Sequence, residues 1–183
     1  MNEVINAIYN RYSCRNFSPN PIDAQQVETL AKAALAAPSA MNLQPWHIIA
    51  ITNKPLIEEM DAYILDGIKA SNAEWYSRMM ERGGKIFYDA PCLIVIAKSD
   101  TDAATLDSGI VSQNIALAAH AMGLGSVICG MARMALDGEK GEAFKKRIQM
   151  PEGYSFGMSV CVGAALSGKA PHELDMQKVT YIV

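Results

Sequence analysis

Two arginines and a serine alternate near the amino terminus, in the sequence RYSCRNF. They are Arg11, Ser13 and Arg15, and in an extended segment residues at this spacing point to the same side. Guanidinium groups pair well with phosphate oxygens, and a serine hydroxyl can donate a further hydrogen bond. The spacing therefore predicts a site for a phosphate group. Two surface arginines beside the end of a helix are the alternative interpretation.

A second group of polar side chains lies in the sequence APSAMNLQPWH, at residues 37–47. Ser39, Asn42 and Gln44 can form hydrogen bonds without carrying charge, and Pro38 and Pro45 stiffen the segment. The edge of a planar heterocycle with carbonyls and ring nitrogens needs partners of this kind. The alternative is a well-formed loop whose polar side chains bond their own backbone.

Glycines flank a short apolar run in residues 123–131, and Gly130 would let the backbone approach a flat molecule. The run is no dinucleotide fingerprint, because it follows a helix and lacks a suitably placed third glycine. The sequence contains no nucleophile elbow and no Walker motif, and His47, His120 and His172 show no metal-ligand spacing. We therefore predict no catalytic residue and no metal, but a cofactor that brings its own reactivity.

Hydrophobic spacing and capping residues predict an α+β fold in one domain, residues 1–183. Asp23 and Gln26 form a capping box, and the apolar run 92–98 belongs in the centre of a sheet. The helix at 107–122 is apolar almost all round, so most of its sides should be buried. The expected helices are 2–10, 24–36, one starting at Pro55, 107–122, and one capped by Asp137 that reaches about 148; the expected strands are 47–52, 92–98, 126–129, 156–166 and 179–183.

Two segments have neither pattern. Residues 67–88 place Trp75 and Tyr76 among charges, and we expect a mobile cover over the pocket that tunes the choice of substrate. A dimer contact is the alternative for this segment. Residues 167–178 are polar, which is typical of an arm rather than of a core.

Composition narrows the class of protein. Half of the 183 residues are hydrophobic and 19% are charged, so the chain can bury a large core, and the low charge fits an oligomer. The net charge of −3 without blocks of like charge argues against nucleic acid and anionic membrane as partners. The four cysteines form no C-x-x-C pair, and no signal peptide or membrane span is visible, so we expect reduced thiols and a cytoplasmic protein.

Nearly the whole chain resembles a small member of the nitroreductase family. The similarity begins with RYSCRNF and continues through AAPSAMNLQPWHI, DAPCLIVIA and DSGIVSQNIALAAHAMGLGSVICG to SVCVGAALSGKAPHELD. The first two blocks, in this order and at this spacing, are specific to the family.

The resemblance implies noncovalent FMN at the interface of a homodimer with shared active sites. It also implies a mixed central β-sheet wrapped by helices, with the C-terminal arm exchanged between subunits. The residues that match family positions at the phosphate and ribityl chain are Arg11, Ser13, Arg15 and Lys169. Those that match positions at the isoalloxazine are Asn42 and Gln44, Pro38 and Ser39 of the partner subunit, and the backbone of Cys129 and Gly130.

The chain also departs from the family pattern. Many relatives carry a second basic residue shortly after the position of Lys169, whereas here Ala170 and Pro171 follow, and we do not expect His172 to replace it. Some larger relatives have a glutamate where Cys129 stands, so no side-chain role carries over to this cysteine.

The expected activity is ping-pong hydride transfer from NAD(P)H through the flavin to an electron-poor acceptor, such as a nitroaromatic or a quinone. Other flavin chemistry on the same scaffold, such as reductive dehalogenation or flavin destruction, is the alternative. A non-catalytic flavin-binding protein and a structural subunit with a decayed site are rivals from other classes. Intact phosphate and loop motifs argue against decay.

Overall fold

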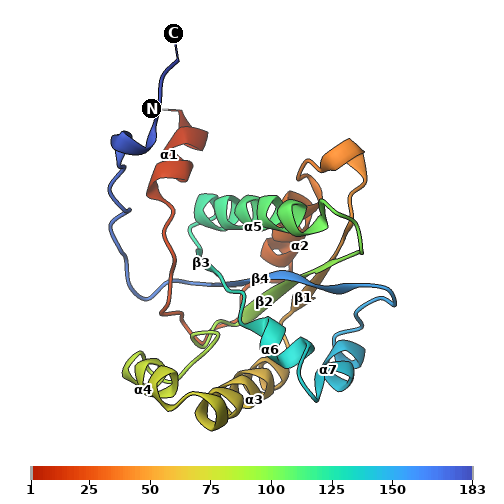
Figure 1. The fold of residues 1–183 in the computed structure, drawn as a ribbon. Coiled ribbons are helices and arrows are strands. Elements are labelled where there is room, and N and C mark those ends of the chain that lie inside the picture. Colours follow the sequence, from red (N-terminus) through yellow and green to blue (C-terminus); the bar gives the residue numbers. More distant parts are fainter. Residues whose placement is uncertain (1, 183) are drawn as a thin grey trace.

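Four strands form the centre of the protein in the computed structural model, which describes residues 2–182 (Figure 1). They are β1 (Trp46–Ile51), β2 (Cys92–Lys98), β3 (Gly125–Ile128) and β4 (Ser155–Gly163), in the order β1-β2-β4-β3. All neighbouring strands pair antiparallel, so the sheet itself is not mixed as expected; a parallel pairing occurs in an isolated bridge between Ser13 and Ser126, outside these strands. The prediction that residues 92–98 form a central strand is confirmed.

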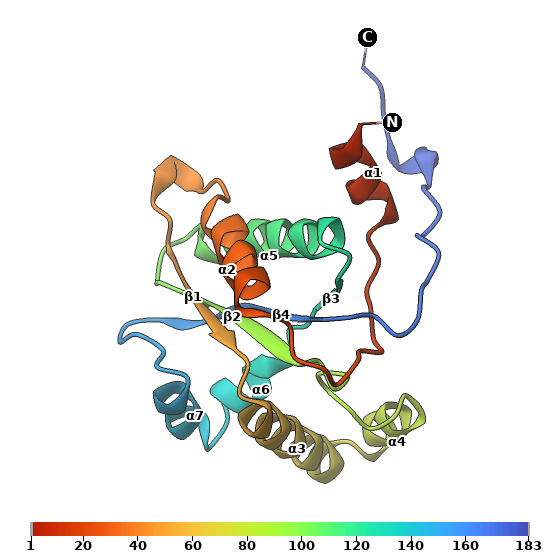
Figure 2. The same cartoon turned by 180° about the vertical axis from the view of Figure 1, so that it is seen from behind.

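Helices cover both faces of the sheet (Figures 1 and 2). One face carries α2 (Ala24–Leu35) and α5 (Ala104–Ala121), and the other carries α3 (Lys54–Ser71), α4 (Ala73–Glu81), α6 (Ala132–Leu136) and α7 (Gly141–Arg147). Side chains of β2 alternate between the faces, because successive strand residues point in opposite directions. Leu93 and Val95 thus join the core under α3, whereas Ile94 and Ile96 join the core under α5.

The chain ends leave the sheet on the same side as each other (Figures 1 and 2). α1 (Glu3–Asn10) exposes Val4, Ile5 and Ile8, and the C-terminal arm, residues 164–182, is exposed throughout, with a short 3₁₀ turn η2 (Met176–Lys178). The strand expected at 179–183 does not form in residues 179–182 of the single chain, and Val183 lies outside the described residues. Such a strand would need a partner strand, so it stays a prediction. No helix among residues 2–182 is both long and apolar enough to cross a membrane.

The helix expected from Asp137 to about 148 is wrong as one element. Asp137 follows the end of α6 instead of starting a helix, and α7 begins only at Gly141. The chain turns tightly between them: a Cβ at Gly141 would meet the carbonyl oxygen of Leu136. Arg133 lies 3.7 Å from Asp137, so this carboxylate pairs backward with α6.

The expectation that residues 67–88 lack a buried pattern is also wrong in part. α3 continues to Ser71, and Asn72 caps α4 by accepting a hydrogen bond of 2.9 Å from the Trp75 amide. Ile68, Met79, Ile86 and Phe87 are core residues. They belong to separate short elements, so no single helical or strand period joins them in the sequence.

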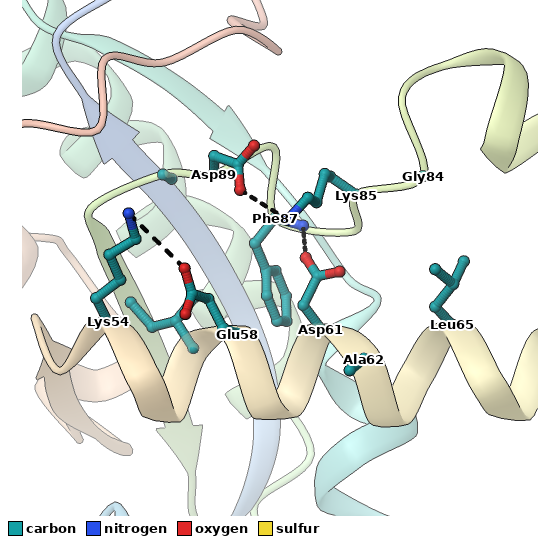
Figure 3. A pocket seen from close by; sticks show the side chains of 11 residues that line it. Lys54, Glu58, Asp61, Ala62, Leu65, Gly84, Lys85, Phe87 and Asp89 are labelled. Atoms are coloured by element: carbon teal, nitrogen blue, oxygen red, sulfur yellow. Dashed lines mark hydrogen bonds and ion pairs between the residues drawn. The ribbon is translucent and has the colours of Figure 1, made fainter.

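A buried carboxylate holds the segment that follows α4. Asp61 of α3 accepts a hydrogen bond of 2.8 Å from the Phe87 amide (Figure 3). The pairs Lys54–Glu58 and Lys85–Asp89 flank it at 3.7 Å and 3.0 Å, around a cavity of about 160 Å³. Burial raises the pKa of Asp61 above its ordinary value. Asp61 therefore ties the turn before β2 to α3.

Substitutions at Asp61 test this structural role. Asp61→Ala leaves the Phe87 amide without an acceptor and should lower the free energy of unfolding by about 1–3 kcal/mol. Asp61→Asn keeps an acceptor and cannot ionise. Because the folded protein holds the Asp61 proton more tightly than the unfolded chain, the wild type loses stability as the pH rises from about 3.9 through the raised pKa.

Urea denaturation near neutral pH should accordingly rank the Asn variant at or above the wild type, and the Ala variant below both. Equal destabilisation by the two substitutions would show that the hydrogen bond to Phe87 is not what Asp61 contributes.

Candidate functional site

The segment that carries the alternating arginines runs in an extended conformation beside β3. Ser13 bridges Ser126, and the Cys14 amide donates to the Ser126 carbonyl at 2.9 Å. Cys14 is 1% exposed and packs against Gly125, where an added Cβ would lie 2.8 Å from the cysteine Sγ. With Cys14 facing the core, Ser13 and its neighbours at alternate positions face away from it, as the spacing predicts.

The outward side chains meet the C-terminal arm at a cavity of about 330 Å³. This basic cavity is lined by Arg11, Tyr12, Ser13, Arg15, Lys169, Ala170, Pro171 and His172. Its lining holds three permanent cations and no carboxylate, and none of the three forms an ion pair within residues 2–182. Like charges gathered without a counter-charge favour an anion between them. The four residues expected at a phosphate are therefore brought together.

Backbone hydrogen bonds hold the root of the arm against the same segment. The Tyr12 hydroxyl donates to the Ser167 carbonyl at 2.8 Å, and the Leu166 amide donates to the Asn16 carbonyl at 3.0 Å. Phe17 forms a bridge with Ala165. Lys169 reaches the cavity only two residues beyond Ser167, so this anchoring determines where its side chain can go. Alternation would have placed Tyr12 on the other side, so sequence reasoning missed its part in the cavity.

The end of β3 offers one backbone group rather than two. The Cys129 amide donates to the Ser159 carbonyl at 2.8 Å, and the Ser159 hydroxyl donates to the Cys129 carbonyl. The Gly130 amide has no acceptor among residues 2–182. A Cβ at Gly130 would meet only Met158 Sδ, at 3.9 Å. Of the two residues expected to present backbone, Gly130 has the free donor.

The Cys129 side chain points into the core. It is 7% exposed, beside Cys161 and the Ile86 carbonyl. A hydrogen bond with the Cys161 thiol lowers the pKa of Cys129, and the positive charge of Arg15 acts in the same direction.

The polar loop, residues 37–45, is strained and internally bonded. Met41, Asn42 and Gln44 have φ angles of 50°, 55° and 47°, a left-handed conformation that non-glycine residues adopt at a cost. The Gln44 amide donates to the Ser39 hydroxyl at 2.9 Å, and the Gln44 side chain donates to Asn42 Oδ1 at 2.9 Å. The alternative interpretation, that these side chains bond within the loop, is therefore correct in part. The side chains of Met41, Asn42 and Gln44 are nevertheless exposed.

The polar loop and the basic cavity lie at opposite ends of the sheet (Figures 1 and 2). The loop leads into Trp46, which faces Lys98 and, across β2, Ser155. Ser13 faces Ser126, which pairs with Val162. Seven positions along β4 separate these two ends, which is about 23 Å. One chain therefore does not bring Pro38, Ser39, Asn42 and Gln44 to its own basic cavity.

The proposed cover residues have different surroundings. Tyr76 is half-buried against the core, with Lys69 Nζ 5.7 Å from its ring centre, whereas Trp75 is 37% exposed. Contact of either residue with a substrate stays a prediction. In residues 2–182, no three His, Cys, Asp or Glu side chains are grouped so that they could hold a metal ion.

Comparisons with known proteins cover almost the whole chain. A model of the nitroreductase family matches residues 8–164. The crystal structure of a nitroreductase with bound FMN from Desulfitobacterium hafniense superposes with a TM-score of 0.96 at 42% identity, covering 100% of both chains. An NADPH-flavin oxidoreductase of Vibrio harveyi is 30% identical over 89% of this chain and 66% of its own length. An FMN reductase (NADPH) of Bacillus subtilis is 26% identical over 93% of this chain and 70% of its own.

Proposed function

The chain belongs to the nitroreductase family, and we propose that it acts as an NAD(P)H-dependent oxidoreductase with noncovalent FMN as its cofactor. The observation that carries this proposal is the basic cavity, where Arg11, Ser13, Arg15 and Lys169 converge without a carboxylate. A solved nitroreductase with 42% identity contains FMN, which supports the choice of cofactor. The domain is taken to span residues 1–183.

The residues of the basic cavity fit a terminal phosphate. Two guanidinium groups and an ammonium supply charge, and the Ser13 hydroxyl supplies a neutral donor. Gly130 lies just beyond the end of β3, four residues after Ser126, and an added Cβ there would contact only Met158 Sδ, at 3.9 Å. A phosphate at one end and a flat ring at the other would thus lie along β3.

When bound, FMN would supply hydride transfer from NAD(P)H to an electron-poor acceptor such as a nitroaromatic or a quinone. The residues of the chain would bind the cofactor and orient it. The Gly130 amide is free to donate to a ring edge, and the basic cavity fixes the phosphate end. One open face over Gly130 would serve donor and acceptor in turn, which is the basis of a ping-pong mechanism. Residues 67–88 would cover this face, which acceptor-dependent kinetics of Trp75→Ala would test.

A second copy of the chain would complete each site. The polar loop is too far from the basic cavity of its own chain, so Pro38, Ser39, Asn42 and Gln44 would all come from the partner subunit. The exposed apolar face of α1 borders a groove of about 300 Å³ against Leu117 on α5, which fits burial in a dimer. We place the interface there, in a two-fold symmetric homodimer.

The free edge of β1 is the proposed receptor for the arm. β1 is an edge strand, and its outer side borders a groove of about 440 Å³ that also contains Arg147, Ile148 and Gln149. Residues 179–182 expose Val179, Tyr181 and Ile182, and an extended segment of this kind can add to a sheet edge. The arm would thereby cross to the partner. The described cysteines are all free, which is consistent with a cytoplasmic protein.

The identity of the cofactor and the role of the basic cavity can be tested together. Mass spectrometry of the released cofactor should find FMN, and FAD as the main species would contradict the terminal-phosphate site. Arg11→Ala removes a charge-assisted contact and should weaken FMN binding roughly tenfold to a hundredfold. Lys146→Ala, at an exposed cation of α7 that lies outside both the cavity and residues 67–88, is the control. An unchanged FMN affinity of Arg11→Ala would refute the proposal that the basic cavity binds the phosphate.

The Gly130 position can be tested by adding one carbon. Since only Met158 Sδ would be near the new Cβ, Gly130→Ala should leave the melting temperature of the apoprotein within about 2 °C of wild type. It should weaken FMN at least about tenfold if the ring lies on this glycine. An FMN affinity equal to that of the wild type would move the ring elsewhere.

Removal of the arm should affect assembly and cofactor together. A chain that lacks residues 168–183 loses Lys169 and the residues proposed to pair with β1, so both dimerisation and FMN binding should weaken. Two further variants separate the causes: Lys169→Ala should keep the dimer and lose FMN affinity, and deletion of 179–183 alone should weaken the dimer first. Sedimentation and flavin titration measure the two effects. An active, FMN-saturated wild-type monomer at low micromolar concentration would contradict the shared site.

A further inference from the structure

The arm brings a histidine as well as a lysine to the basic cavity. His172 lines it three residues after Lys169, and the intervening Pro171 restricts the backbone between them. We propose that His172 is a further phosphate-binding residue and that its protonation makes FMN affinity depend on pH. The inference rests on the proposed function, because it concerns the same phosphate. It reverses the expectation from the sequence that His172 does not replace the missing second basic residue.

The position of His172 follows from the anchoring of the arm. Hydrogen bonds from Tyr12 to Ser167 and from Leu166 to Asn16 hold the arm root to the extended segment. His172 lies five residues beyond Ser167, on the stretch that closes the cavity from the arm side. It is exposed, so its imidazole can exchange protons with water.

The charges that face the imidazole come from both walls of the cavity. Arg11 and Arg15 on the extended segment and Lys169 on the arm are permanent cations, and Ser13 is neutral. Burial raises the pKa of Tyr12, so its phenol stays neutral as well. Glu173, the next residue on the arm, does not line the cavity.

Among the side-chain types in this lining, an imidazole is the one that can change between a neutral and a cationic form near neutral pH. A phosphate dianion among three fixed cations has room for a fourth donor, and an imidazolium provides two N–H groups. By linkage, a bound phosphate that prefers the imidazolium form takes up a proton at His172, and acidification then favours binding. The phosphate itself titrates near pH 6, which acts in the opposite direction. Only a comparison between variants isolates the histidine.

The experiment titrates apoprotein with FMN by flavin fluorescence, for wild type, His172→Gln and His172→Arg. The readout is the ratio of the Kd of His172→Gln to that of wild type at each pH, which cancels the titration of the phosphate. We expect a ratio of about five to ten near pH 6, and below about two near pH 8.5. His172→Arg, with a permanent charge, should bind FMN tightly at both pH values. Riboflavin, which lacks the phosphate, should show a ratio near one throughout.

Each alternative outcome is distinct. A ratio that is near one at both pH values, or one that does not change with pH, overturns the role of the imidazolium. An equal effect on riboflavin assigns the histidine to the conformation of the arm instead of the phosphate. If the wild type binds neither flavin, the proposed function fails, and the failure is separate from that of His172.

Discussion

The pairing of a short extended segment with β3 is the constraint on which the site depends. Ser13 bridges Ser126, and Cys14 fits against Gly125 with no room for a side chain there. This pairing sets the direction of every second side chain from Arg11 to Arg15. It also provides the surface to which the arm is bonded through Tyr12, Asn16 and Phe17. Backbone pairing thus brings three cationic side chains to one cavity, although the lining contains no carboxylate that would attract them.

In a single chain, the polar loop and the basic cavity are far apart, and apolar surface stays exposed. The polar loop is strained and preformed, yet it stands about 23 Å from the cavity along the sheet. α1 and the arm expose apolar side chains, and β1 has a free edge. Strain, exposed apolar surface and an unpaired edge are each costly for an isolated soluble protein. In the proposed homodimer, the exposed apolar surface and the free edge of β1 would both be covered by the partner subunit.

Most of the helices and strands, and the alternation of residues 11–15, can be predicted from the sequence, because each of these patterns is local. The capping box at Asp23, the inward residues of α3 and the burial of β2 from Cys92 to Ala97 follow from spacing alone. The alternation from Arg11 to Arg15 was readable for the same reason, since a period of two needs only five residues. The meeting of this segment with Lys169 was expected only through resemblance, because nothing local joins positions so far apart in the chain.

The features that the sequence did not predict depend on tertiary contacts. Ile68, Met79 and Phe87 enter one core from separate short elements, so no period reveals them. The break between α6 and α7 depends on a close approach of Gly141 to Leu136, which is a tertiary contact. That Cys129 has both backbone groups occupied, whereas Gly130 does not, depends on the hydroxyl of Ser159 across the ladder.

The burial of the four cysteine thiols affects how resistant the protein is to oxidation. Oxidants react with thiolates rather than with thiols, so the pKa and the burial of each cysteine decide how easily it is oxidised. Burial raises the pKa of Cys14, and of Cys92 to about 12, while Cys161 is held well above its ordinary value through its pairing with Cys129. The pKa of Cys129 is lowered by its hydrogen bond with the Cys161 thiol, but its side chain is 7% exposed and is therefore largely shielded from oxidants. Burial thus protects the four thiols, and oxidation should occur first at exposed methionines such as Met41.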